Sequence, residues 1–455
     1  MVSRTVMTVF RESLRGASFT PGDPGYDDAR VVFNRSVDRR PAIIARCAGA
    51  ADAITCVNFA REQGLPVSVR AGGHSIAGKA ICDDGLMIDL SAMKAIRVDP
   101  GARTVRAEPG VTIREFDRET QAFGLATTMG VISTTGIAGL TLGGGMGWLI
   151  GKHGLACDNV IAMDVVTANG RLLKASEQDN PDLFWALRGG GGNFGIVTSF
   201  EYRLHSLGPL FGGGVLYPIE QTREVLRFYR DFAFSGPDEL TTQMGRICTP
   251  DGVPVIGVAG CYSGALEDGE KLLAPLRRLG SPVLDLFGPM SYLQMQSMFD
   301  PWFPPGRQAY WKANFLHDLS DEAIDIFHRC AQTVPSPYTT GPWLEAVHGA
   351  VSRVGATDTA FAHRRYPFNF LVLSSWSEAS EAERNIAWTR DCWDAMRPFM
   401  APGAYVNYLE AEANPRDRAA YGNNYDRLVT IKDKYDPDNF FRVNFNIQPS
   451  GAVRR

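Results

Sequence analysis

Residues 70–91, RAGGHSIAGKAICDDGLMIDLS, place one histidine among four glycines. Gly73, Gly78 and Lys79 satisfy G-x-x-x-x-G-K, the spacing of a phosphate-binding P-loop. A P-loop also needs a Ser or Thr hydroxyl for Mg²⁺ and a helix that opens at the phosphates, whereas here Ala80 follows and the tail alternates as a strand does. The segment therefore does not predict a nucleoside triphosphatase. Its glycines still indicate backbone that approaches a ligand closely.

A second glycine run, GGGNFG at 190–195, satisfies the dinucleotide fingerprint G-x-G-x-x-G. In a Rossmann unit this fingerprint follows a strand and opens a helix. Here the run follows the helical pattern DLFWALR and precedes the strand pattern IVTSFEY, which is the reverse order. The run predicts close backbone contact with a ligand, but it does not predict a Rossmann fold.

Three glycine-rich segments succeed one another along the chain: RAGGHSIAG, TTGIAGLTLGGGMGWLIGKHGLACDNV and RGGGGNFGIV. In this order and spacing they resemble the PCMH-type FAD-binding domain of the vanillyl-alcohol-oxidase superfamily. More narrowly, they are similar to its berberine-bridge-enzyme-like and bacterial FAD-linked oxidases. DRLVTIKDKYDPDNFFRVNFNI, near the C-terminus, is similar to the family's C-terminal signature, so the resemblance covers nearly the whole chain. It implies an FAD-linked oxidoreductase.

The resemblance implies a covalent anchor for FAD at His74, because the family's histidine in this motif carries the cofactor through an 8α-histidyl bond. Some relatives add a second bond through the cysteine of a segment that reads C-P-T-V-G. The matching residues here are 132–136, ISTTG, so Ile132 stands at the cysteine position. We therefore expect FAD to be held by a single covalent bond.

The same resemblance implies which other residues surround FAD. Backbone N–H groups and hydroxyls suit a diphosphate that is held without bulky cations. Val197 falls where the family makes its adenine-side backbone contact. The implied cofactor-binding set is Arg70, Gly72, Gly73, His74, Ser75, Gly78, Ile132, Ser133, Thr134, Thr135, Gly136, Gly139, Gly143, Asp158, Asn159, Val197, Asn444 and Asn446.

A catalytic base is implied at Tyr408, in YVNYLEAEANP, which matches the tyrosine that related sugar and alcohol oxidases place over the flavin. There the tyrosine takes the proton of the substrate hydroxyl. With an ordinary pKa of about 10, a tyrosine is a poor base unless a neighbouring cation or hydrogen bond lowers that pKa. Candidate neighbours are Lys312, His363 and Arg364, although a solvated lysine and a packed histidine are the more ordinary interpretations of these positions. No metal site is expected.

Short strands and helices that could position these residues alternate from 42 to 205, in an α+β pattern rather than a regular βαβ succession. Strands are predicted at 42–47, 66–72, 85–90 and 195–204, hairpins at 95–110 and 160–176, and helices at 51–64, 112–124 and 180–189. Asn169-Gly170 supplies the turn of the second hairpin, since this dipeptide tolerates positive φ.

A change of texture at 206–212, SLGPLFG, marks a predicted domain boundary. Beyond it, long helices are predicted at 222–236, 266–280 and 380–400, with strands at 253–262 and 368–376. We expect an FAD-binding domain from 1–205, completed by 405–455, and an inserted substrate domain at 206–404. The inserted domain should be an antiparallel sheet backed by helices.

Bulk composition excludes several classes of protein. The 455 residues are 45% hydrophobic, with a formal net charge of −4, and the pI of about 6.0 provides no basic field for nucleic acid. No apolar run of about 18 residues predicts a membrane span, and the N-terminus lacks a signal-peptide pattern, so a cytoplasmic chain is expected. The eight scattered cysteines should be buried, reduced thiols. A monomer or a homodimer fits these data.

The function expected from this pattern is oxidation of a small organic substrate, an alcohol or a secondary-metabolite intermediate, by hydride transfer to flavin N5 with O₂ as acceptor. Five aromatic residues favour an aromatic or polyketide-like substrate, although residues at helix or strand spacing are more often plain core: Tyr310, Trp311, Trp343, Trp376 and Tyr405. The alternatives are a dehydrogenase with another acceptor, a carbohydrate oxidase, which the single tether disfavours, and a flavin-loaded binding protein without turnover.

Overall fold

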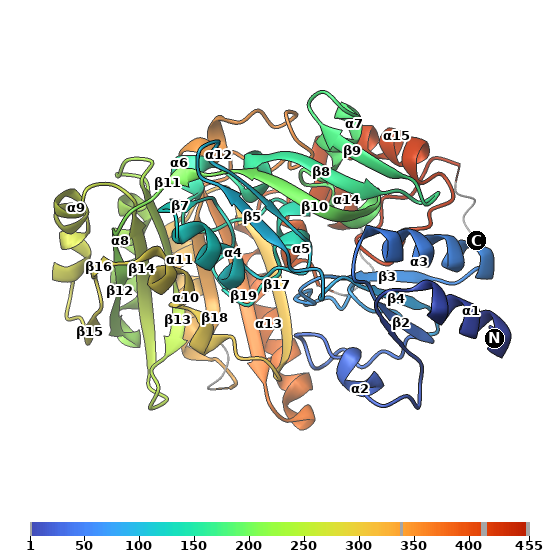
Figure 1. Ribbon diagram of the computed structural model, residues 1–455. Coiled ribbons are helices and arrows are strands. Elements are labelled where there is room, and N and C mark those ends of the chain that lie inside the picture. The colour runs from blue at the N-terminus through green and yellow to red at the C-terminus, as the bar shows by residue number, and fades with distance from the viewer. Residues whose placement is uncertain (1, 337–339, 411–415, 452–455) are drawn as a thin grey trace.

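The computed structural model describes residues 2–336, 340–410 and 416–451, which form three main sheets with helices around them (Figure 1). The mixture of helices and mainly antiparallel sheets confirms the α+β class. Within the described ranges, no helix has both the length and the apolar character needed to cross a membrane. All eight cysteines are free thiols, seven buried and Cys248 half-buried, as the sequence predicts.

The first sheet has four strands in the order β1 (Ala17–Phe19), β2 (Ile43–Arg46), β4 (Leu86–Asp89), β3 (Val67–Arg70). Strands β2 and β3 both run parallel to β4, so a crossover must join them. Helix α3 (Ala50–Gln63) makes this crossover and ends at Gly64, whose φ of 63° suits glycine. Strand β3 ends directly at the loop that carries His74.

The second sheet has five antiparallel strands in the order β5 (Ile96–Asp99), β6 (Thr104–Ala107), β10 (Ile196–Arg203), β8 (Val160–Val166), β9 (Leu172–Ser176). Both predicted hairpins are confirmed, and Gly170 has a φ of 75° in the turn of the second. Helix α4 (Ile113–Gln121) starts with a capping box between Thr112 and Glu115. Helix α7 (Pro181–Leu187) leads into the glycine run before β10.

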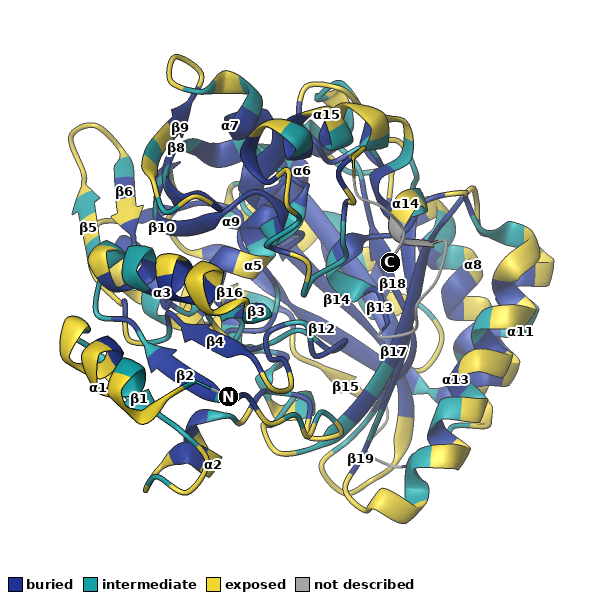
Figure 2. Ribbon diagram, turned by 90° about the vertical axis from the view of Figure 1, so that its right-hand side faces the viewer, coloured by how far each residue is buried: buried dark blue, intermediate teal, exposed yellow. Residues whose placement is uncertain are grey.

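The third sheet has eight strands, with β16 (Gly288–Met290) paired to β12 beside the main path. The main path reads β15 (Leu284–Asp285), β12 (Leu210–Pro218), β14 (Pro254–Tyr262), β13 (Leu240–Cys248), β18 (Gly341–Ala346), β19 (Phe368–Trp376), β17 (Gln308–Leu316). Helices α8 (Thr222–Phe232), α11 (Asp321–Gln332) and α13 (Ala382–Met396) lie together along one face of this sheet (Figure 2). Helix α13 is shorter than the helix predicted at 380–400, because a 3₁₀ turn flanks it at each end.

Side chains alternate between the two faces of the third sheet along each strand. Phe370 and Val372 pack into the core beneath the helices, whereas Leu371 and Leu373 face the first two sheets. This second face carries the substrate end of the site described below.

The C-terminal segment returns to the second sheet, where α15 (Tyr425–Tyr435) packs against α7. Leu428 and Ile431 share a core with Leu183 and Phe194. The domain limits 1–205, 206–404 and 405–455 stay a prediction. The remaining helices are α1 (Arg4–Ser13), α2 (Tyr26–Ala29), α5 (Ile137–Leu142), α6 (Ile150–His153), α9 (Leu266–Arg278), α10 (Tyr292–Ser297), α12 (Ala350–Arg353) and α14 (Arg416–Tyr421), and β7 (Leu125–Ala126) pairs with β11 (His205–Ser206).

Candidate active site

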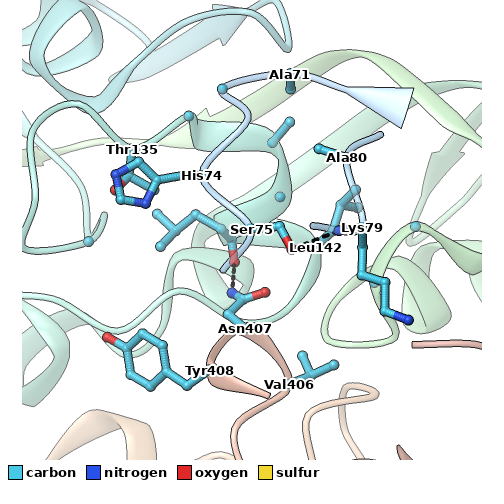
Figure 3. Close-up of a pocket in the computed structure, with 18 of the residues that line it drawn as sticks. Ala71, His74, Ser75, Lys79, Ala80, Thr135, Leu142, Val406, Asn407 and Tyr408 are labelled. Atoms are coloured by element: carbon cyan, nitrogen blue, oxygen red, sulfur yellow. Dashed lines mark hydrogen bonds between the residues drawn. The ribbon is translucent and has the colours of Figure 1, made fainter. Parts of the chain in front are cut away.

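A cavity of about 300 Å³ lies where the three glycine-rich segments meet the open face of the third sheet. Its lining includes the loop after β3, the segment before and within α5, the glycine run before β10, and side chains from β13, β17, β18 and β19. Figure 3 shows His74, Ser75 and Thr135 on one side and Asn407 and Tyr408 on the other. Segments distant in the sequence therefore form one site.

Two of the glycine segments touch through their backbones. A Cβ atom built on Gly72 would lie 2.5 Å from the Gly136 nitrogen, and one built on Gly136 would lie 2.6 Å from the Gly72 nitrogen. Real Cβ atoms do not approach backbone this closely, so any side chain at either position would force the loops apart. These glycines hold the His74 loop beside residues 132–136.

Other glycines face open space in the cavity. A Cβ built on Gly139 or Gly192 would meet no atom within 4 Å, and both residues line the cavity. Asn444 also lines it, and its buried Oδ1 has no hydrogen-bond partner among the described residues. Open space beside these glycines and an unpartnered amide oxygen fit a ligand that approaches the backbone closely and carries polar groups, such as FAD.

Contacts with Phe33 and Thr134 fix the orientation of the His74 ring. Its ring stacks on Phe33 with 3.8 Å between centroids. Its Nε2 lies 3.5 Å from Oγ1 of Thr134. Burial lowers the pKa of His74 to about 4, so the imidazole is neutral near pH 7 and keeps a free nitrogen lone pair.

At the substrate end, three polar side chains form a hydrogen-bonded chain. Tyr408 Oη donates to Glu345 Oε1 at 3.0 Å, and Asn369 Nδ2 donates to Glu345 Oε2 at 2.7 Å. Burial raises the pKa of Glu345 to about 7, while the two hydrogen bonds oppose this shift. Burial and the neighbouring carboxylate raise the pKa of Tyr408 well above 10. Tyr408 therefore keeps its proton, and Glu345 is the group that can accept one near neutral pH.

The sequence analysis missed Glu345, Gln243, Phe299 and Phe303, all of which line the cavity. The one available signal for Glu345 was a single charged residue inside the apolar strand GPWLEA. Of the predicted aromatic wall, Trp311, Trp343 and Tyr405 line the cavity.

Tyr310 and Trp376 do not line the cavity. Tyr310 stacks with Arg390 of α13, on the helix-covered face, because its neighbour Trp311 takes the cavity face. Trp376 is 1% exposed within the sheet.

The predicted cationic neighbours of Tyr408 also lie elsewhere. Lys312 points to the helix-covered face, where its Nζ lies 2.8 Å from Glu410 Oε1 and over the Trp393 ring. His363 donates from Nε2 to the backbone oxygen of Ala419 at 2.9 Å, and burial lowers its pKa. None of the described cavity residues places a cation beside Tyr408, which corrects the expected arrangement.

Arg364 is buried and binds the Asp158 carboxylate with both terminal nitrogens, at 2.7 and 2.9 Å. Asn159 donates to the backbone oxygens of His153 and Leu155. Asp158 and Asn159 therefore fasten the loop behind the glycines rather than line the cavity.

Arg70 and Ser133 have similar structural partners. The Arg70 guanidinium binds Asp89 and the backbone oxygen of Ala29, while Ser133 donates its N–H to Asp300. Gly78 and Gly143 pack against Val37 and Asn407 respectively. The cavity is lined by Gly72, Gly73, His74, Ser75, Ile132, Thr135, Gly136, Gly139, Val197, Tyr408 and Asn444, but not by Arg70, Gly78, Ser133, Thr134, Gly143, Asp158, Asn159, Lys312, His363 or Asn446.

Comparisons with known proteins agree with this geometry. A family model for an FAD binding domain matches residues 41–176, and one described as berberine and berberine like matches residues 404–448. An FAD-linked oxidoreductase of Dictyostelium discoideum is 32% identical over 449 residues, covering 98% of this chain and 97% of the relative. The (R)-6-hydroxynicotine oxidase of Paenarthrobacter nicotinovorans is 30% identical, covering 97% and 98%. The crystal structure of 6-hydroxy-D-nicotine oxidase from Arthrobacter nicotinovorans matches with a TM-score of 0.87 at 28% identity, covering 99% of this chain and 100% of that one.

Proposed function

Because this chain belongs to the berberine-bridge-enzyme-like FAD-linked oxidoreductases of the vanillyl-alcohol-oxidase superfamily, we propose that it is an oxidase of a small aromatic alcohol or amine. The observation that carries this proposal is the Tyr408–Glu345 pair, set in an aromatic cavity that continues to the glycine-rich segments. Bound FAD would supply the redox chemistry, as the acceptor of a hydride from the substrate and the donor of two electrons to O₂, which would leave as hydrogen peroxide.

The residues proposed to hold FAD are the cavity-lining glycines, Thr135, Val197 and Asn444, with His74 as the single covalent anchor. A neutral, oriented imidazole suits this role, because only the unprotonated nitrogen can form a bond to carbon. Ile132 stands in the cavity lining and offers no thiol for a second bond.

Acid precipitation tests the anchor. Flavin colour should stay with the pellet of the wild-type protein and wash out of the His74→Ala pellet. Colour that washes out of both pellets would contradict the covalent bond but leave bound FAD possible. Colour that stays with both pellets would show that a residue other than His74 forms the covalent bond.

The proton of the substrate is proposed to go to Glu345. Its carboxylate accepts hydrogen bonds from Tyr408 and Asn369, and each oxygen keeps a lone pair for a substrate O–H or N–H. Tyr408 orients the carboxylate and stabilises its charged form. The aromatic side chains around the pair exclude water from the substrate end.

The acceptor is tested by mixing the substrate-reduced protein with O₂ in a stopped-flow instrument. Rapid return of the flavin absorbance with stoichiometric hydrogen peroxide supports an oxidase. Slow reoxidation by O₂ with fast reoxidation by a quinone would instead identify a dehydrogenase. Failure of a broad panel of aromatic alcohols, amines and sugars to bleach the flavin would favour a binding protein without turnover.

A further inference from the structure

A row of polar side chains crosses the cavity face of the third sheet. Gln243 on β13 lies opposite Glu345 on β18, and Glu345 lies opposite Asn369 on β19. The three residues are 4%, 3% and 0% exposed, respectively. Buried polar groups on a largely apolar face are costly unless they bind something, so each member of the row needs a partner.

Gln243 has a carboxamide whose orientation is fixed. Trp343 Nε1 lies 3.0 Å from its Oε1. An indole N–H can only donate, so the carboxamide oxygen must face Trp343 and the NH₂ group must point the other way. Among the described residues, Gln243 Nε2 has no hydrogen-bond acceptor, and Gln243 lines the cavity.

The backbone beside Gln243 supports this orientation. Gly245 lies opposite Trp343, and a Cβ atom built on it would lie 2.0 Å from the indole ring. The absence of a side chain at Gly245 lets the indole lie across β13 and reach Gln243. The packing of Trp343 against Gly245 therefore fixes the direction in which the Gln243 NH₂ group points.

Gln243 and Glu345 lie among aromatic side chains of the cavity lining. Trp343 meets Phe299 edge-on with 5.2 Å between centroids, and Trp311 meets Phe303 edge-on at 5.8 Å. All four rings line the cavity. Directly opposed residues on adjacent strands have Cβ atoms roughly 5 Å apart, so the Gln243 donor and the Glu345 acceptor lie side by side.

We infer that Gln243 is a specificity-determining residue, which selects a flat aromatic substrate with a hydrogen-bond acceptor next to the O–H or N–H that gives its proton to Glu345. Gln243 Nε2 donates to the acceptor atom and Glu345 receives the hydrogen bond of the neighbouring donor. The inference deepens the proposed function and rests on it, since Glu345 is taken as the proton acceptor.

Binding to the flavin-loaded protein, measured by calorimetry without turnover, tests this inference. Three flat probes separate the two contacts: benzamide offers an acceptor beside a donor, acetophenone an acceptor, and aniline mainly a donor. Wild-type protein should bind benzamide most tightly. Gln243→Leu should weaken benzamide and acetophenone by roughly 3- to 10-fold and leave aniline unchanged, because one neutral hydrogen bond is lost.

Two further variants keep the result interpretable. Gln243→Met removes the N–H donor at nearly the same side-chain length and should weaken the same two probes, even if the leucine variant fails to fold. Thr242→Val is the matched control, since the Thr242 hydroxyl bonds Tyr229 on the opposite face of the same strand. All three affinities should be unchanged in this control.

Wild-type affinities for benzamide and acetophenone in both folded Gln243 variants would overturn the inference, as would the absence of benzamide binding by the wild type at millimolar concentration. Failure of the proposed function has a different signature. In that case the probe selectivity would depend on Gln243 as described, while no candidate substrate would reduce the flavin of the wild-type protein.

Discussion

At the scale of single residues, the chemistry depends on the protonation of Glu345. With a pKa raised to about 7 by burial, the carboxylate is a base only above that pH. We expect wild-type kcat/KM to rise through about pH 7, and Glu345→Gln to lower it by roughly 10²- to 10⁴-fold. Tyr408→Phe removes a hydrogen bond to the carboxylate and should move the rising limb to higher pH. An unshifted limb in Tyr408→Phe would contradict the assignment.

The same carboxyl should influence folding stability. Its pKa rises from an ordinary value of 4.5 to about 7 on folding, so the folded state binds the proton more tightly than the unfolded state does. The resulting stabilisation is present below about pH 4.5 and is lost as pH rises towards 7. Subtracting the Tm of Glu345→Gln from that of wild type at each pH should reveal this loss. A difference that is constant from pH 4 to about pH 8 would contradict it.

The sequence predicted site residues correctly where the backbone geometry requires a glycine. Gly72, Gly136 and Gly139 fall in the glycine-rich segments and line the cavity. Arg70 belongs to one of those segments and Ser133 directly precedes another, but their side chains turn to Asp89 and Asp300. Glu345 and Gln243 belong to no motif, because their role comes from the register of strands far apart in the sequence.

At the scale of elements, one lysine fastens the C-terminal segment to the glycine run before β10. Lys432 is fully buried, and its Nζ donates to Asp436 at 2.6 Å, to the Asn193 oxygen at 2.8 Å and to the Phe441 oxygen at 3.1 Å. Lys432→Met would leave the Asp436 charge buried without a cation. We expect a loss of about 3–5 kcal/mol in the free energy of unfolding.

Urea unfolding monitored by circular dichroism measures this loss. The matched control is Lys434→Met on the same helix, where Nζ pairs with Asp182 and the lysine side chain is 58% exposed. That variant should lose less than about 1 kcal/mol. Equal losses in the two variants would show that burial of the pair does not matter.

Elements with one solvated face or a strong cap were predictable, such as α4 with its capping box and the β8–β9 hairpin with its Asn-Gly turn. Strands β13 and β18 were not, because LTTQMGRIC and GPWLEA show neither alternation nor the continuous apolar run by which the equally buried β14 and β19 were predicted. The site depends on these two strands. Its glycine half was therefore visible in the sequence, whereas the substrate half was visible only in Tyr408 and the aromatic residues Trp311, Trp343 and Tyr405.

At the scale of the whole molecule, the cavity exists because the third sheet docks on the cofactor-side loops, and Asp300 spans that junction. Its carboxylate accepts hydrogen bonds from the Ser133 hydroxyl and, at 2.9 Å, from the Ser133 N–H, and it pairs with Arg114 at 2.8 Å. Asp300→Ala should lower the free energy of unfolding by about 1–3 kcal/mol, since hydrogen bonds to a charged acceptor are lost. Most of this effect should come from Ser133, because the Arg114 side chain is 62% exposed and its ion pair is weakened by solvent.

Thermal and urea unfolding of Asp300→Ala measure this junction, and two substitutions frame the result. Ser133→Ala removes the hydroxyl but keeps the backbone donor, so it should cost less than Asp300→Ala. Asp231 lies on α8, and its side chain is 81% exposed. Asp231→Asn should therefore change the free energy of unfolding by less than about 1 kcal/mol. If Asp300→Ala were as stable as Asp231→Asn, the docking of the sheet would not depend on this contact, and the cavity would keep its shape without it.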